Sequence, residues 1–139
     1  MHVQWKYQVD KENILIDGPC GLAHARLAIL DLSKTGDQPM VSSNGQFICV
    51  FNGEIYNFQK IRKKLENKKV TFKGSSDTEV LLESWNVWGS KTLNYLDGMF
   101  AFAIWDKFNK KLFIARDRIG EKPLYYSLEK NAINFVLRP

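Results

Sequence analysis

The stretch from Met99 to Trp105 constrains the fold more than any other, because it runs without a polar residue until Asp106. A strand with one exposed face alternates between apolar and polar residues, whereas a strand that is apolar on both faces is covered on both sides. We therefore predict a layered fold with this strand at its centre. Alternation predicts two buried faces, formed by Phe100, Phe102 and Ile104 on one side and by Met99, Ala101, Ala103 and Trp105 on the other.

Shorter apolar stretches predict the remaining elements. Further strands are expected at residues 13–16, 22–30, 47–51, 70–73, 111–116, 124–127 and 133–137. Helices are expected at 57–68 and 76–88, with a short helical turn at 93–98. The second helix begins with the capping-box pair Ser76 and Glu79 and stops before Gly89. A chain of 139 residues with this pattern predicts one α+β domain of mostly antiparallel strands.

Asn52, Gly53 and Glu54 are expected where the buried strand 47–51 stops and the chain turns toward the next helix. Asn-Gly is the strongest short turn signal, so these residues could simply form a turn. The same junction could instead hold a backbone N–H, an amide and a carboxylate rigidly around a small ligand. Arg26 raises a similar choice, because a guanidinium within an apolar strand needs a partner. That partner is either a structural salt bridge or the carboxylate of a ligand.

Composition argues against several classes of protein. The formal net charge is +5, and much of it lies in the lysine-rich stretch 60–69. This stretch is typical of a solvated helix face rather than a nucleic-acid site, because no aromatic residues alternate with its lysines as a stacking platform needs. No apolar run approaches the length of a membrane span, and the N-terminus shows no signal-peptide pattern.

The chain has only two cysteines, Cys20 and Cys49, and two histidines, His2 and His24. The lack of a cysteine framework favours a reducing cytoplasm. The usual ligand pattern of a zinc site is missing, so no metal is expected. Cys49 and His24 could form a catalytic pair, but a cysteine within an apolar strand is usually a small hydrophobe.

Four motifs occur in order at residues 23–29, 51–57, 76–80 and 115–126. They read Ala-His-Ala-Arg-Leu-Ala-Ile, Phe-Asn-Gly-Glu-Ile-Tyr-Asn, Ser-Asp-Thr-Glu-Val and Ala-Arg-Asp-Arg-Ile-Gly-Glu-Lys-Pro-Leu-Tyr-Tyr. Together they resemble the class II glutamine amidotransferase domain, an N-terminal-nucleophile hydrolase, of glutamine-hydrolysing asparagine synthetases. The last motif resembles asparagine synthetases rather than glucosamine-phosphate synthases or phosphoribosyl amidotransferases, which share only the Asn-Gly and Ser-Asp parts. The resemblance is strongest over residues 21–127.

The resemblance implies a four-layer αββα sandwich of mostly antiparallel strands. On this interpretation residues 1–139 form a partial amidotransferase domain, incomplete at both termini, and the ATP-dependent synthetase domain is absent. The implied reaction hydrolyses glutamine to glutamate and ammonia, which the synthetase domain uses with ATP to convert aspartate to asparagine.

The implied partners are glutamine and the synthetase domain, and the full-length enzyme could form a homodimer. Neither nucleic acid nor a membrane is expected as a partner. No cofactor is expected in this domain, whereas ATP and Mg²⁺ are expected in the synthetase domain.

The resemblance also implies roles for five residues. Arg26 pairs with the carboxylate of glutamine, and Asp77 and Glu54 hold its ammonium group. Asn52 and the N–H of Gly53 form the oxyanion hole, two donors aimed at the charge that develops during the reaction. Arg26, Asn52, Glu54 and Asp77 are expected to converge on one pocket.

One departure from the family concerns the nucleophile. The family nucleophile is a cysteine at the mature N-terminus, whereas this sequence begins Met1-His2-Val3. Cys20-Gly21 resembles the family's opening Cys-Gly pair but lies between two predicted strands. We therefore expect the chain as printed to be inactive alone, and a non-catalytic module that binds glutamine or a partner is the alternative. The residues expected to brace the sheet are Arg116, Asp117 and Lys122.

Overall fold

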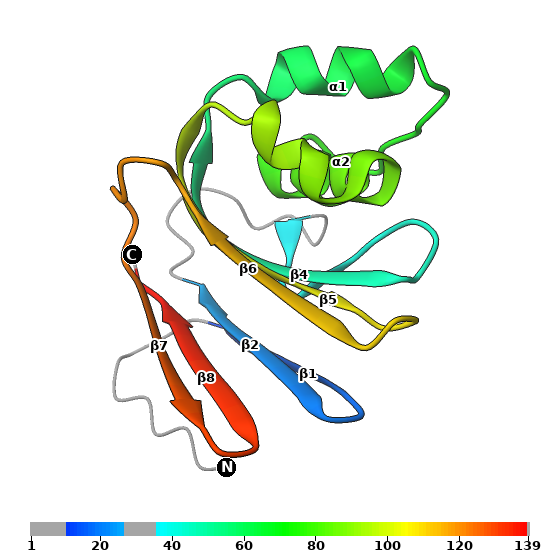
Figure 1. The fold of residues 1–139 in the computed structure, drawn as a ribbon. Coiled ribbons are helices and arrows are strands. Elements are labelled where there is room, and N and C mark those ends of the chain that lie inside the picture. The colour runs from blue at the N-terminus through cyan, green and yellow to red at the C-terminus, as the bar shows by residue number, and fades with distance from the viewer. Residues whose placement is uncertain (1–10, 27–35, 139) are drawn as a thin grey trace.

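The computed structural model describes residues 11–26 and 36–138, which form a central sheet, two hairpins and a pair of α-helices (Figure 1). The central sheet is antiparallel with the order β3 (Met40–Val41), β4 (Phe47–Ile55), β5 (Gly98–Asp106) and β6 (Lys111–Arg116). The hairpins are β1 (Lys11–Asp17) with β2 (Cys20–Arg26), and β7 (Leu124–Glu129) with β8 (Ala132–Leu137). The helices are α1 (Phe58–Glu66), α2 (Asp77–Trp88) and the 3-10 helix η2 (Gly89–Asn94).

The described elements stack in three layers. Helices α1 and α2 cover one face of the central sheet, and the two hairpins lie on the other face (Figure 1). This arrangement confirms the α+β class and the mostly antiparallel sandwich predicted from the sequence. The described residues supply three of the four layers that the resemblance implied.

Strand β5 is buried on both faces, as its sequence predicted. Phe100, Phe102 and Ile104 belong to the core beneath the helices, while Ala103 and Trp105 belong to the core beneath the hairpins. A strand at the centre of a layered fold buries apolar area in two cores at once. Each Å² of apolar surface removed from water stabilises the fold by about 25 cal/mol.

The predicted turn at Asn52-Gly53-Glu54 is wrong, because β4 continues to Ile55 and the chain turns only at Tyr56 and Asn57. The strand persists because each of these residues is paired with β5, including Gly53 with Phe100. Gly53 has a φ of +131°, and a Cβ there would lie 2.1 Å from the carbonyl oxygen of Met99. Only glycine permits this close approach of the two strands.

Three other sequence predictions need correction at their boundaries. The strand expected at 70–73 does not form. The N–H groups of Lys73 and Gly74 donate to the carboxylate of Glu79 rather than to a neighbouring strand. The helical turn expected at 93–98 lies earlier, as η2 from Gly89 to Asn94, and Gly98 already begins β5. The strand expected at 22–30 is β2, which ends at Arg26, and residues 27–35 lie outside the described part of the chain.

Helix α2 has the ends that its sequence predicted. The Ser76 side chain accepts the Glu79 N–H at 3.2 Å, and Gly89 ends the helix with a φ of +58°. Further along, the Glu83 carboxylate accepts the Ser43 N–H at 2.7 Å and the Ser43 hydroxyl at 2.8 Å. This pair of bonds fastens the β3–β4 turn to α2, because a carboxylate that accepts two bonds in a buried position is a strong anchor.

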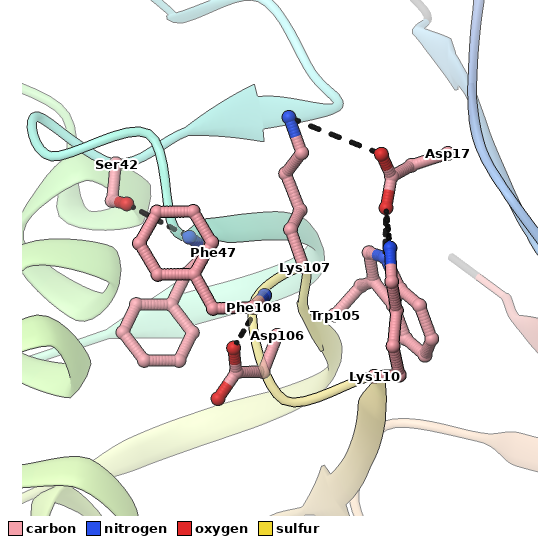
Figure 2. A network of polar contacts seen from close by, with 8 residues as sticks. All are labelled: Asp17, Ser42, Phe47, Trp105, Asp106, Lys107, Phe108 and Lys110. Atoms are coloured by element: carbon pink, nitrogen blue, oxygen red, sulfur yellow. Dashed lines mark hydrogen bonds and ion pairs between the residues drawn. The ribbon is translucent and has the colours of Figure 1, made fainter.

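Polar contacts also join the first hairpin to the central sheet. Figure 2 shows the carboxylate of Asp17 between the indole N–H of Trp105, at 2.7 Å, and the amine of Lys107, at 3.9 Å. The amine of Lys110 lies 3.4 Å from the same carboxylate. The turn of β1–β2 is therefore held against the β5–β6 turn by a buried ring donor and two lysines.

Candidate functional site

A pocket of about 250 Å³ opens at the edge of the central sheet, on the side where β3 begins at Met40. It is lined by His24, Gly36, Gln38, Phe51, Asn52, Gly53, Ser76, Asp77 and Thr78. Pockets that hold drug-sized ligands measure about 300–1,000 Å³, so this one suits a smaller molecule. Three residues singled out from the sequence, Asn52, Gly53 and Asp77, thus share one pocket although 25 positions separate the first from the last.

The backbone of β4 presents a polar edge to this pocket. In an antiparallel strand, alternate residues direct their N–H groups to the same edge. Phe51 and Ile55 direct theirs away from β5, to the side chains of Gln38 at 2.6 Å and Asp77 at 3.0 Å. Gly53 lies midway between them, so its N–H faces the same edge and the pocket that Gly53 lines. The strand therefore offers one backbone donor to a ligand.

Asp77 lies at the first position of α2 and combines a structural bond with a charge at the pocket. One carboxylate oxygen accepts the Ile55 N–H at 3.0 Å. Burial raises the pKa of Asp77 and the charge of Glu54 adds to the rise, while hydrogen bonds from backbone N–H groups oppose it. A cationic ligand group beside Asp77 would relieve the cost of its burial.

The other predicted site residues are placed differently. Asn52 lines the pocket, and its side-chain amide donates to the backbone carbonyl of Arg138. Glu54 is exposed and outside the pocket lining, although its charge reaches Asp77. Arg26 ends β2, two residues beyond the pocket-lining His24, and its side chain lies outside the described part of the structure.

Sequence reasoning did not assign Gln38, Thr78 or His24 to the site. His24 shares a strand with Arg26, so alternation along β2 was the signal that could have included it. Thr78 follows Asp77 in the first turn of α2. Gln38 lies in an irregular segment before β3, where no periodicity marks a buried side chain, yet it is only 8% exposed.

Neither cysteine lies at this pocket. Cys49 is fully buried in the core on the helix side of the sheet, whereas the hairpin that carries His24 packs on the opposite side, so they do not form a catalytic pair. Burial raises the pKa of the Cys49 thiol. Cys20 begins β2 and is paired with Asp17, about 13 Å along the strand from His24 at about 3.3 Å per residue.

Asp117 confirms the structural role expected of it. Its carboxylate accepts the N–H groups of Phe100, Gly120, Glu121 and Lys122. Burial raises the pKa of Asp117, but these four bonds outweigh burial and lower it to about 2. Because Phe100 is paired with Gly53, this loop braces the strand directly behind the pocket.

Within residues 11–26 and 36–138, no cluster of three or more histidine, cysteine or acidic side chains could hold a metal ion. None of the helices described has the length and apolarity needed to cross a membrane.

Comparisons with known proteins agree with one another. Residues 7–137 match the model of the family described as "Glutamine amidotransferase domain". The chain is 38% identical over 128 residues to glutamine-hydrolyzing asparagine synthetase 3 of Bacillus subtilis (strain 168), and this match covers 91% of this chain and 21% of that protein. It is 38% identical over 113 residues to amidase chry2 of Gibberella zeae, which covers 81% of this chain and 17% of that protein. The chain thus spans about a fifth of the length of these relatives.

A solved structure supports the same relation. The glutamine phosphoribosylpyrophosphate amidotransferase of B. subtilis, complexed with ADP and GMP, superposes with a TM-score of 0.64 at 26% sequence identity. The match covers 81% of this chain and 26% of that chain.

Proposed function

Because the chain belongs to the glutamine amidotransferase domain family, we propose that its pocket binds glutamine and that the domain serves to release ammonia from the glutamine side chain. The observation that carries the proposal is the meeting of Asn52, Gly53 and Asp77 in one small pocket, at an edge where Gly53 presents a backbone donor. These groups come from β4 and from the N-terminus of α2.

The chemistry of free glutamine suits these groups. Its ammonium would lie beside the buried carboxylate of Asp77, with the charge of Glu54 nearby. Its carboxylate would pair with Arg26, whose planar fork matches a carboxylate. Its side-chain carbonyl would accept from the Gly53 N–H and from Asn52. Since the Asn52 amide has two N–H groups and one bonds to Arg138, one remains for the ligand.

The Gly53 N–H and the Asn52 amide would act as the oxyanion hole. When a nucleophile attacks the carboxamide, negative charge moves to the carbonyl oxygen, and fixed donors stabilise that charge. Removing one such donor costs about 2.7–4 kcal/mol of barrier in characterised enzymes. The nucleophile of the family is an N-terminal cysteine, and we assign this role to neither Cys20 nor Cys49, because of their positions.

We further propose that the domain acts in a longer protein of the asparagine synthetase type. Support comes from curated relatives named glutamine-hydrolyzing asparagine synthetases, of which this chain covers about a fifth. In that protein the ammonia would pass to a synthetase domain that uses ATP and Mg²⁺ to amidate aspartate. The proposal includes a cytoplasmic location, and it requires no metal or cofactor in the pocket.

Titration with L-glutamine tests the proposal, with the amide signals of an isotopically labelled sample as the readout. We expect saturable binding that shifts the Gly53 signal, and no such response to D-glutamine. Asp77→Asn keeps an oxygen for the Ile55 N–H but removes the charge, so affinity should fall about 10-fold or more. Asp97→Asn, an exposed acidic residue outside the pocket lining, is the matched control and should bind normally. A chain that folds but does not respond to L-glutamine would refute the proposal.

A further inference from the structure

Alternate residues of β4 direct their N–H groups to its outer edge, away from β5. All but one of these residues have a partner on that edge. The N–H of Phe47 donates to the Ser42 hydroxyl, and Cys49 is paired with Met40 of β3. The N–H groups of Phe51 and Ile55 donate to Gln38 and Asp77. Within the described part of the chain, no side chain or neighbouring strand on this edge accepts the N–H of Gly53.

Gln38 takes the place that a longer β3 would fill. Its side-chain oxygen accepts the Phe51 N–H at 2.6 Å, and its side-chain nitrogen lies 3.5 Å from the hydroxyl of Thr78. Its own backbone carbonyl accepts from the side chain of Asn13 at 3.1 Å. Gln38 and Thr78 are only 8% and 5% exposed, so both are enclosed. Gln38 thus links the edge of β4 to α2 through its side-chain amide and to hairpin β1–β2 through its backbone carbonyl.

This link has a consequence for Gly53. Glycine has more backbone freedom than any other residue, so a donor on a glycine is poorly aimed unless its neighbours are fixed. Here the two flanking N–H groups on the same edge are fixed by Gln38 and Asp77. A continuous strand at this place would have paired with the Gly53 N–H as well, whereas a side chain of one residue stops short of it.

We infer that Gln38 is a positioning residue of the glutamine site, which holds the Phe51 end of this edge so that the Gly53 N–H points at the side-chain carbonyl of glutamine. The inference rests on the proposed function of the pocket. It assigns Gln38 no contact with the substrate, and it predicts that Gln38 matters for the carboxamide of the ligand rather than for the amino-acid group.

The experiment compares two ligands on the full chain. L-Glutamine carries the carboxamide, whereas L-norvaline keeps the α-carboxylate and α-ammonium but has a methyl group in its place. Gln38→Met preserves side-chain length and removes both polar atoms. The matched control is Gln59→Met, which makes the same change at an exposed position on α1. Thr78→Val removes the partner of the Gln38 nitrogen with little change in volume, so it serves if Gln38→Met does not fold.

We expect Gln38→Met to lower the affinity for glutamine about 10-fold, because the Phe51 N–H loses its acceptor and the Gly53 N–H is no longer held in position. Norvaline affinity should stay within about 2-fold, and the Phe51 amide should exchange faster with solvent. Thr78→Val should lower the ratio of glutamine to norvaline affinity in the same direction, and Gln59→Met should leave that ratio unchanged.

Unchanged glutamine affinity in Gln38→Met would overturn the inference while leaving the proposed function intact. An equal loss for glutamine and norvaline would also overturn it, because it would indicate general damage to the pocket. Failure of the unsubstituted chain to bind glutamine would overturn both the inference and the proposed function.

Discussion

Replacing Gly53 with alanine tests the contact between β4 and β5 on which the pocket depends. The added Cβ would lie 2.1 Å from the Met99 carbonyl oxygen and 2.7 Å from the Phe100 Cα. Both obstacles are backbone atoms of the central strand, so a side-chain rotation cannot relieve the clash. The residue would also keep a φ of +131°, which alanine rarely adopts.

The cost can be worked from these two terms. An unfavourable backbone conformation costs about 1–3 kcal/mol. Overpacking in a well-packed interior costs about another 1–3 kcal/mol. Because the backbone of β5 cannot move cheaply, we expect the upper half of the sum, about 4–6 kcal/mol. That is a large part of the about 5–15 kcal/mol by which domains are stable. It corresponds to a fall in Tm of more than about 10 °C for a domain of this size.

Thermal unfolding followed by circular dichroism measures this loss. Gly21→Ala is the matched control, since a Cβ at Gly21 of β2 meets no atom within 4 Å. Its Tm should be unchanged or slightly higher, because alanine lowers the entropy of the unfolded chain. Gly98→Ala should resemble Gly53→Ala, since its Cβ would lie 2.2 Å from the Glu54 carbonyl oxygen. If Gly53→Ala unfolded within about 2 °C of the unsubstituted chain, the close approach of the strands would be refuted.

Three further outcomes are expected. The folded-state pKa of Asp117 is lowered from 3.8 to about 2, so the stabilisation by this carboxylate is present above about pH 4 and is lost as the pH falls toward 2. The free energy of unfolding of Asp117→Asn should therefore fall less steeply with pH in this window than that of the unsubstituted chain. Glu121→Gln, at an exposed position, should show the same pH dependence as the unsubstituted chain. A thiol reagent should modify Cys20 but not buried Cys49 in the native chain, and both after denaturation; rapid native modification of Cys49 would contradict its burial. Ammonia release from glutamine by a protein that contains this domain should not depend on Cys20 or Cys49, because neither thiol lies at the pocket. Ammonia release that disappeared in Cys20→Ala would reverse that expectation.

Much of the fold was predictable because local patterns and burial agree. The apolar stretch Met99–Trp105 could only be satisfied between two layers, and the structure places its alternating residues in two cores. The capping pair Ser76 and Glu79 and the stop at Gly89 fixed the ends of α2 through bonds within a few residues. Such signals survive folding because they depend on nearest neighbours along the chain.

The site was only partly predictable. The motifs pointed to Asn52, Gly53 and Asp77, and the structure gathers these three in one pocket. Asn-Gly favoured a turn, yet the pairing of Gly53 with Phe100 extended the strand through it. The local turn propensity was overridden by two non-local interactions, the hydrogen-bonded pairing of β4 with β5 and the close packing of Gly53 against the backbone of β5.

The sequence by itself determined which residues could be strand, helix or cap, since periodicity and capping are properties of adjacent positions. Tertiary structure alone decided that Gln38, in a segment without any pattern, completes the edge of β4 and that Asp77 closes the same edge from another element. The physical reason is that a buried N–H must find an acceptor, and which side chain supplies it depends on how distant segments meet in space.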